Sequence, residues 1–153
     1  MKTLKRTTSK DPDFIRLVNE LDAYLRKLDG EEHAFYNQYN AIENLGNVAV
    51  LYKNEMAVAC GAFKMFDDKS VEIKRMYTSQ MARNEGCASL VLDELEKWAV
   101  ELGFSICVLE TGHKQKEANN LYLKCGYAVT LNYGQYVGIE NSICYKKELN
   151  DLD

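Results

Sequence analysis

Apolar residues recur with a helical period near the beginning of the chain. Asp11 and Pro12 form a favourable helix start, because the aspartate side chain accepts hydrogen bonds from free backbone amides and proline fits the first helical turn. Apolar side chains then recur every three or four residues until Gly30, at Phe14, Leu17, Val18, Leu21, Leu25 and Leu28. This pattern predicts an amphipathic helix over residues 12–29, followed by a short aromatic helix over residues 31–39.

Three apolar runs follow, separated by two short turns. We expect strands over residues 48–53, 56–66 and 71–78, with turns at Asn54-Glu55 and Asp67-Asp68. Connections this short join antiparallel neighbours. The pattern therefore predicts three consecutive antiparallel strands.

The periodicity changes at Gly86. Apolar positions return to helical spacing from there to Gly103, which predicts a long amphipathic helix. Further along the chain we expect a buried strand over residues 104–110, a shorter helix over 117–124, and strands over 127–133 and 142–149. Because the long helix connects the strands over 71–78 and 104–110, those strands should be parallel. The sheet is then mixed and the fold class is α/β.

Composition limits the classes of function that fit this chain. Its 153 residues are 46% hydrophobic and 27% charged, without repeats or linkers, so we expect one globular domain over residues 1–153. The net charge of −4 argues against nucleic acid as a partner, and no apolar run approaches the roughly 20 residues of a membrane span. The five cysteines have no zinc-ligand spacing and follow no signal-type segment. This favours reduced thiols in the cytoplasm and no metal.

The segment from Arg83 to Ala88 has the features of an anion site. It precedes the predicted long helix, whose first backbone amides have no partner within the helix. Gly86 allows a ligand to approach the backbone closely, and Arg83 supplies a guanidinium for phosphate oxygens. The segment lacks the Walker and dinucleotide-binding patterns, and an ordinary helix entrance is the alternative.

Two further residues are chemical candidates. Glu72 is a carboxylate within a predicted strand, so it either pairs with a basic residue such as Lys74 or acts as a general base. Tyr122 shares a helix face with Ala118 and Leu121, where it is either a packing aromatic or a proton donor.

Together these segments resemble the GNAT superfamily of N-acetyltransferases. Residues 71–127 contain, in order, a strand with Glu72, Arg83-x-x-Gly86-x-Ala88, a long helix, a buried strand, and a helix with Ala118-x-x-Leu121-Tyr122-x-x-x-Gly126-Tyr127. Each motif alone is weak, but their order and spacing make the resemblance specific. It implies a mixed sheet of about six to seven strands with splayed central parallel strands, flanked by about four helices.

The resemblance also implies acetyl-CoA as co-substrate and a role for each candidate. Glu72 would be the general base and Tyr122 the acid in direct acetyl transfer to a primary amine of a small molecule or peptide. The Met76 amide would donate to the acetyl carbonyl oxygen. The implied cofactor contacts are Met76, Tyr77, Thr78, Arg83, Asn84, Glu85, Gly86, Cys87, Ala88, Ser89, Gln115 and Asn119. Gln115 stands where the family often has asparagine, a shorter side chain with the same donor and acceptor.

The acceptor site is the least constrained part of the prediction. By the resemblance, the amine enters opposite the cofactor, where His33, Tyr36 and Tyr133 are candidate contacts; ordinary aromatic packing is the alternative. A domain that holds acyl-CoA as a sensor without turnover is the main rival function, and an interaction domain without a ligand is the second. Dimers are common in this superfamily, so a homodimer through the C-terminal strand is a further candidate feature.

Overall fold

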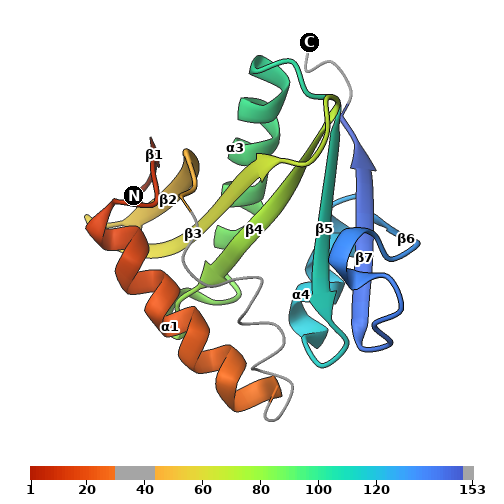
Figure 1. Cartoon of the computed structure of the whole chain (residues 1–153). Coiled ribbons are helices and arrows are strands. Elements are labelled where there is room, and N and C mark those ends of the chain that lie inside the picture. The colour runs from red at the N-terminus through yellow and green to blue at the C-terminus, as the bar shows by residue number, and fades with distance from the viewer. Residues whose placement is uncertain (30–43, 150–153) are drawn as a thin grey trace.

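The computed structural model describes residues 1–29 and 44–149 of the chain (Figure 1). The elements within these residues are β1 Lys2–Thr7, α1 Pro12–Asp29, β2 Asn47–Lys53, β3 Met56–Met65, β4 Ser70–Thr78, η2 Gln80–Ala82, α3 Cys87–Glu101, β5 Ile106–Gly112, α4 Lys116–Lys124, β6 Ala128–Thr130, η3 Gly134–Tyr136 and β7 Ser142–Glu148. Those labelled η are short 3-10 helices.

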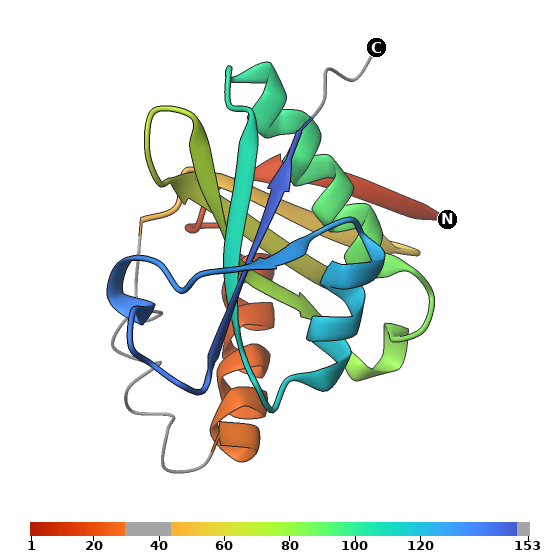
Figure 2. The ribbon, with the colours of Figure 1, turned by 90° about the vertical axis from the view of Figure 1, so that its right-hand side faces the viewer.

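The seven strands form one mixed sheet in the order β1-β2-β3-β4-β5-β7-β6. The β4–β5 pair is parallel, and all other neighbours are antiparallel. Helix α1 lies in front of the sheet in Figure 1, and α3 lies behind it. In Figure 2, α3 and α4 lie to the right of β5 and β7, and the loop that carries η3 lies to the left. The fold is therefore the expected α/β arrangement.

Each face of the sheet has its own apolar core. On the α1 face, Phe14 and Leu17 pack against β2 and β3. On the other face, α3 contributes Val91, Leu92 and Leu95 to a larger cluster that includes residues of β4 and β5. Because successive strand residues point to opposite faces, β4 places Val71 and Ile73 in the α3 core and Glu72 and Lys74 on the α1 side.

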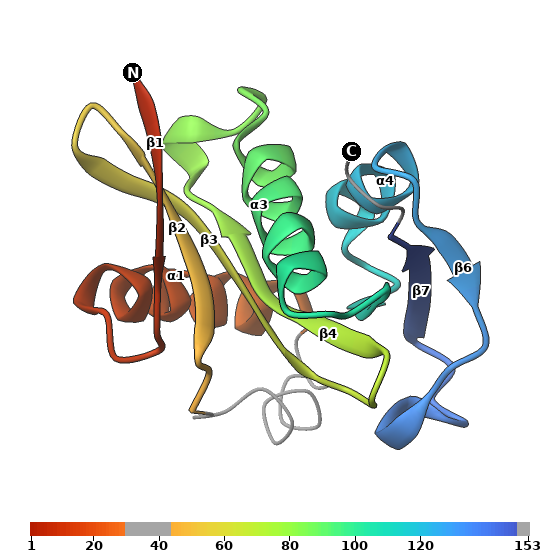
Figure 3. The ribbon, with the colours of Figure 1, turned by 90° about the horizontal axis from the view of Figure 1, so that it is seen from above.

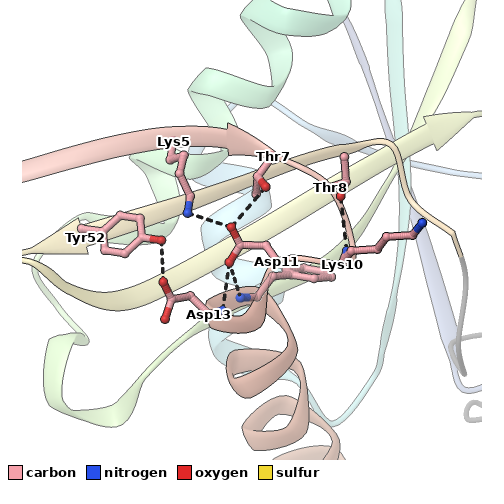
Figure 4. Close-up of polar contacts among 8 residues, drawn as sticks. Lys5, Thr7, Thr8, Lys10, Asp11, Asp13 and Tyr52 are labelled. Carbon is pink, nitrogen blue, oxygen red and sulfur yellow. Dashed lines mark hydrogen bonds and ion pairs between the residues drawn. The ribbon is translucent and has the colours of Figure 1, made fainter.

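Helix α1 begins where the sequence indicated, and Figure 4 shows why. Asp11 Oδ1 accepts hydrogen bonds from the backbone amides of Asp13 (2.9 Å) and Phe14 (3.3 Å), which caps the helix. Its other oxygen, Oδ2, pairs with Lys5 Nζ at 2.7 Å and accepts from Thr7. Burial alone would raise the pKa of Asp11, but the hydrogen bonds from Lys5, Phe14, Thr7 and Asp13 lower it below its usual range.

Most predicted elements are confirmed, with small shifts of their ends. Strand β1 was not predicted, because its side chains are polar or exposed on both faces and show no alternation. The predicted strand over 127–133 is shorter, since β6 ends at Thr130 and η3 follows. Among the described residues there are three α-helices, one fewer than expected; the short helix predicted over 31–39 lies outside them.

The two parallel strands separate soon after they meet. Ser70, Val71 and Glu72 pair with Ile106, Cys107 and Val108, and the pairing then stops although both strands continue. Figure 1 shows β4 and β5 diverging toward α1 and α4, and Figure 3 shows β6 and β7 set apart from β1–β4. The expected splay is therefore present. Among the described strands, none pairs with β4 on this side beyond Glu72.

A β-bulge lies on the free part of β4. Lys74 pairs with Ala62 and Tyr77 with Cys60, so Arg75 and Met76 together face Gly61. Arg75 has a φ of 60°, which is uncommon outside glycine. A Cβ on Gly61 would collide with Met76 Sδ, so the Met76 side chain occupies space that glycine leaves free.

Candidate functional site

Two adjoining cavities lie where β4 and β5 separate. The larger, of about 440 Å³, borders the N-terminus of α3 and one face of α4. The smaller, of about 80 Å³, borders α1, β4, β5 and η3. Leu21, Met76, Gln115 and Tyr122 line both cavities. A reacting pair of molecules could therefore meet at these four residues, one from each side.

The larger cavity brings together most of the residues predicted to contact the cofactor. Its lining includes Met76, Tyr77, Thr78, Arg83, Asn84, Gly86, Cys87, Ala88, Ser89 and Gln115. These residues come from the free end of β4, the loop before α3, the first turn of α3 and the start of α4. The predicted segments thus form one continuous wall in space.

The end of this cavity beside α3 has the properties of an anion site. Gly86 precedes α3 in a left-handed conformation (φ 76°), and no side chain caps the helix there. The first amides of this 15-residue helix are therefore available to a ligand. Arg83 Nε donates to the Thr78 carbonyl oxygen at 3.2 Å, and its guanidinium lies 5.1 Å from the centre of the Tyr24 ring. Thr78 Oγ1 is buried and has no hydrogen-bond partner among the described residues.

Two residues predicted to contact the cofactor do not line the larger cavity. Glu85 pairs with Lys53 Nζ at 2.7 Å, and its carbonyl oxygen accepts from Lys2 Nζ at 2.7 Å. Asn119 accepts hydrogen bonds from Thr111 and Tyr145 and donates to the Gly112 carbonyl oxygen. Glu85 therefore ties the loop before α3 to β1 and β2. Asn119 ties α4 to β5 and β7.

In the smaller cavity, Glu72 is 4% exposed and its partner is a tyrosine. The Tyr133 hydroxyl donates a hydrogen bond to Glu72 Oε2 at 2.8 Å. Burial and the adjacent Glu72 carboxylate raise the pKa of Tyr133 above its usual range, so the phenol remains a donor at neutral pH. Lys64 is in register with Glu72 on the neighbouring strand, and Lys74 and Glu110 line the same cavity.

Tyr122 occupies the boundary between the cavities. It is 5% exposed, and its ring contacts those of Tyr127 and Tyr145 at centroid distances of 5.8 and 6.0 Å. Burial raises the pKa of Tyr122 well above its usual range. Its hydroxyl has no hydrogen-bond partner in the part of the chain that the structure describes. The residue is thus both a packing aromatic and a protonated hydroxyl at the cavity wall.

The predicted acceptor contacts are only partly placed. His33 and Tyr36 lie outside the described residues. Tyr133 does not line the smaller cavity but stands behind Glu72, with ring contacts to Phe66 and Tyr136. Tyr136 of η3 is the aromatic residue of this loop that lines the cavity. No local sequence signal reveals that Tyr133 bonds a residue 61 positions earlier.

A metal site, a disulfide and a membrane-spanning helix each need features that the described residues lack. They contain no group of three or more His, Cys, Asp or Glu side chains placed to hold a metal ion. All five cysteines are free thiols, and burial raises the pKa of Cys107 to about 12 and of Cys144 to about 11. None of the described helices has both the length and the apolar character that crossing a membrane requires.

The sequence matches a known protein family. The model of the Acetyltransferase (GNAT) family matches residues 14–127. The chain is 30% identical over 127 residues to YsnE of Bacillus subtilis, described as an uncharacterized N-acetyltransferase; the match covers 82% of this chain and 76% of YsnE. It is 32% identical over 88 residues to YedL of Escherichia coli, described in the same words, covering 56% of this chain and 55% of YedL.

Solved structures show the same fold over nearly the whole chain. A putative acyl-CoA N-acyltransferase from Klebsiella pneumoniae superposes with a TM-score of 0.82 at 26% identity, covering 98% of this chain and 99% of the other. A GNAT family acetyltransferase from Elizabethkingia anophelis, solved with acetyl-CoA bound, superposes with a TM-score of 0.67 at 18% identity, covering 97% and 98%.

Proposed function

This chain belongs to the GNAT acetyltransferase family, and we propose that it transfers the acetyl group of acetyl-CoA directly to a primary amine. The observation that carries the proposal is the pair of adjoining cavities that share Met76 and Tyr122 at the point where β4 and β5 diverge. The larger cavity would take the acetyl donor and the smaller cavity the amine.

The residues of the larger cavity fit acetyl-CoA, in which an extended arm joins the thioester to a pyrophosphate. The uncapped first turn of α3 and Arg83 would bind the pyrophosphate oxygens. Thr78 Oγ1, buried without a hydrogen-bond partner among the described residues, would gain one from the ligand. The backbone of Met76, Tyr77 and Thr78, unpaired on the β5 side, would hold the extended arm. Acetyl-CoA supplies the activated acetyl group, and the protein's own residues bind and orient it.

Glu72 would remove the proton from the attacking amine. An alkylammonium with a lysine-like pKa must be deprotonated first, at a cost of about 4–5 kcal/mol at neutral pH. A well-placed general base contributes about 10²–10⁴-fold, which is a comparable amount. The Glu72 carboxylate borders the smaller cavity, and Tyr133 holds its Oε2, so Oε1 is the atom that would accept the proton directly or through water.

Tyr122 and Met76 would act on the donor side. The Tyr122 hydroxyl, kept protonated by burial, would donate to the leaving sulfur. The Met76 amide belongs to the bulge on the free edge of β4 and would donate to the carbonyl oxygen as negative charge develops there. Both groups line the boundary of the two cavities, where the acetyl group would pass from one molecule to the other.

Two measurements test this function. Acetyl-CoA at a hundred times its Kd should stabilise the protein by about 2.7 kcal/mol, seen as a rise in Tm. A panel of primary amines, assayed by release of free thiol, should reveal turnover. Glu72→Gln should lower turnover by about 10²–10⁴-fold while the Tm shift persists. If acetyl-CoA raises Tm but no amine causes release of thiol, the protein is an acyl-CoA sensor and not an enzyme. If acetyl-CoA neither raises Tm nor releases thiol, both the enzyme and the sensor hypotheses are rejected.

A further inference from the structure

Arg75 is an arginine buried beside the acceptor cavity. Its side chain is 8% exposed, and Nη1 pairs with Asp22 Oδ1 of α1 at 2.9 Å. The bulge on β4, with φ of 60° at Arg75, inserts the extra residue that lets this side chain reach α1. A strained backbone next to a cavity is commonly kept for function.

The Arg75 guanidinium is only partly used by the protein. A guanidinium has five N–H donors, and among the described residues Asp22 is the only hydrogen-bond partner of this one. In the part of the chain that the structure describes, no Arg75 nitrogen is both fully buried and without a hydrogen bond, so the donors that Asp22 leaves unused keep some exposed surface. Arg75 lines the smaller cavity and not the larger one. Its free donors therefore serve the acceptor side, whereas Arg83 serves the pyrophosphate side.

The charges around the smaller cavity are of both signs. Glu72 and Glu110 contribute carboxylates from β4 and β5, while Lys74 and Arg75 contribute cations from β4. The two cations would repel a polyamine, and the two carboxylates would repel an acceptor with several carboxylates. A molecule that carries one ammonium and one carboxylate can match both signs.

We propose that Arg75 binds a carboxylate of the acceptor, and that the acceptor is an amino acid or a similar small aminocarboxylate. This inference rests on the proposed acetyl transfer. The ammonium nitrogen would lie toward Glu72, which deprotonates it, and the carboxylate would bind the free side of the Arg75 guanidinium. No bond forms or breaks at Arg75, so the residue determines specificity and takes no part in the chemical step.

The rival interpretation is that Arg75 only clamps β4 to α1 through Asp22. Two variants separate the alternatives: Arg75→Gln removes the guanidinium, and Asp22→Asn keeps it but removes the negative charge paired with it. A clamp predicts that both variants lose activity alike. Carboxylate binding predicts opposite effects on acid turnover, because Asp22→Asn leaves the Arg75 charge without a protein counter-charge and so available to the acceptor carboxylate.

The test uses the intact protein, acetyl-CoA, and the common amino acids paired with their carboxamides. The ratio of kcat/KM for each acid to that for its amide is compared between variants, which cancels the different basicities of the two amines. We expect Arg75→Gln to lower the ratio for the preferred acid by about ten- to a hundredfold, mainly through KM, as loss of a charged hydrogen bond does. Activity with the amide should change little, and Asp22→Asn should keep or raise the ratio.

The outcomes are distinct. An unchanged ratio in Arg75→Gln, equal losses in both variants, or turnover of amides and polyamines but not of acids would overturn the inference while leaving the acetyltransferase function in place. If no amine of any class releases thiol and acetyl-CoA does not raise Tm, the proposed function fails, and the role of Arg75 fails with it.

Discussion

The Tyr133 hydroxyl and the Glu72 carboxylate, 61 residues apart in the chain, share a hydrogen bond of 2.8 Å. Glu72 belongs to β4, and Tyr133 belongs to the loop between β6 and η3, on the far side of the splay. The bond fixes Oε2 of a buried carboxylate, and the proposed proton transfer would use Oε1. Tyr133 is thus a positioning residue for the proposed base.

Replacing Tyr133 with phenylalanine tests this relationship. The hydroxyl donates to Glu72 Oε2 at 2.8 Å, so its removal should free the carboxylate to rotate away from the orientation that the proposed reaction needs. We expect turnover at neutral pH to fall about tenfold, with little change in KM for acetyl-CoA. Phe66→Leu is the control, because it removes a ring contact of Tyr133 but keeps the hydroxyl. Equal losses of turnover in the two variants would show that Tyr133 only packs.

Tyr122→Phe should separate chemistry from binding. The ring contacts with Tyr127 and Tyr145 do not involve the hydroxyl, so the fold and the Tm should be retained. Without a donor near the leaving sulfur, kcat should fall by about 10²-fold or more, and KM for acetyl-CoA should change little. Steady-state kinetics with thiol detection gives both values. If kcat stays at the wild-type level, Tyr122 is not the acid.

Gly86→Ala should weaken binding of acetyl-CoA. The residue has φ of 76°, a conformation that costs an alanine about 1 kcal/mol, and a methyl group there would stand beside the anion site. We expect KM for acetyl-CoA to rise about tenfold with a modest fall in Tm. Gly103→Ala is the matched control: it too has a left-handed φ, of 96°, and its Cβ meets nothing within 4 Å, but it follows the other end of α3. Equal effects of the two substitutions would contradict a role for Gly86 in the cavity.

The Asp11 cap predicts a pH-dependent contribution to stability. The pKa of Asp11 is lower in the folded protein, so the folded state is stabilised above the unfolded pKa of about 3.9, and this stabilisation is lost as pH falls through the folded value. Asp11→Asn keeps a capping oxygen but loses the charge paired with Lys5, so it should lower the free energy of unfolding by about 1 kcal/mol at pH 7. The difference from wild type should shrink below about pH 4. Urea unfolding at several pH values measures it; a difference independent of pH would point to packing instead.

The sequence predicts local features of this protein better than distant pairings. The core strands, the three described helices and the loop at Gly86 all have periodicity or capping signals, and each appears in the structure. The edge strand β1 has neither, because Lys2–Thr7 is held by backbone pairing to β2 and not by burial of one face. Its detection requires knowledge of the neighbouring strand.

The site residues show the same contrast between local features and distant pairings. Glu72 and Tyr122 follow from the resemblance; Glu72 lines the smaller cavity, and Tyr122 lines both. The partners that orient the site are long-range: Lys53 holds Glu85 from 32 residues away, and Asp22 meets Arg75 from 53. At the bulge that carries Arg75, Met76 packs against Gly61 of the next strand. Such pairings arise from tertiary packing, so the spacing of residues along the sequence does not predict them.

The short pairing between β4 and β5 has a mechanical consequence. Only three residues of each strand join the half-sheet β1–β4 to the half-sheet β5–β7, and the edges beyond them face each other without a ladder. A ligand arm seated there would pair with the free edge of β4 and extend the sheet across the gap. Saturation with acetyl-CoA should therefore slow hydrogen exchange at the amides of residues 73–78 that face the β5 side, and so tie the two half-sheets together beyond the three paired residues.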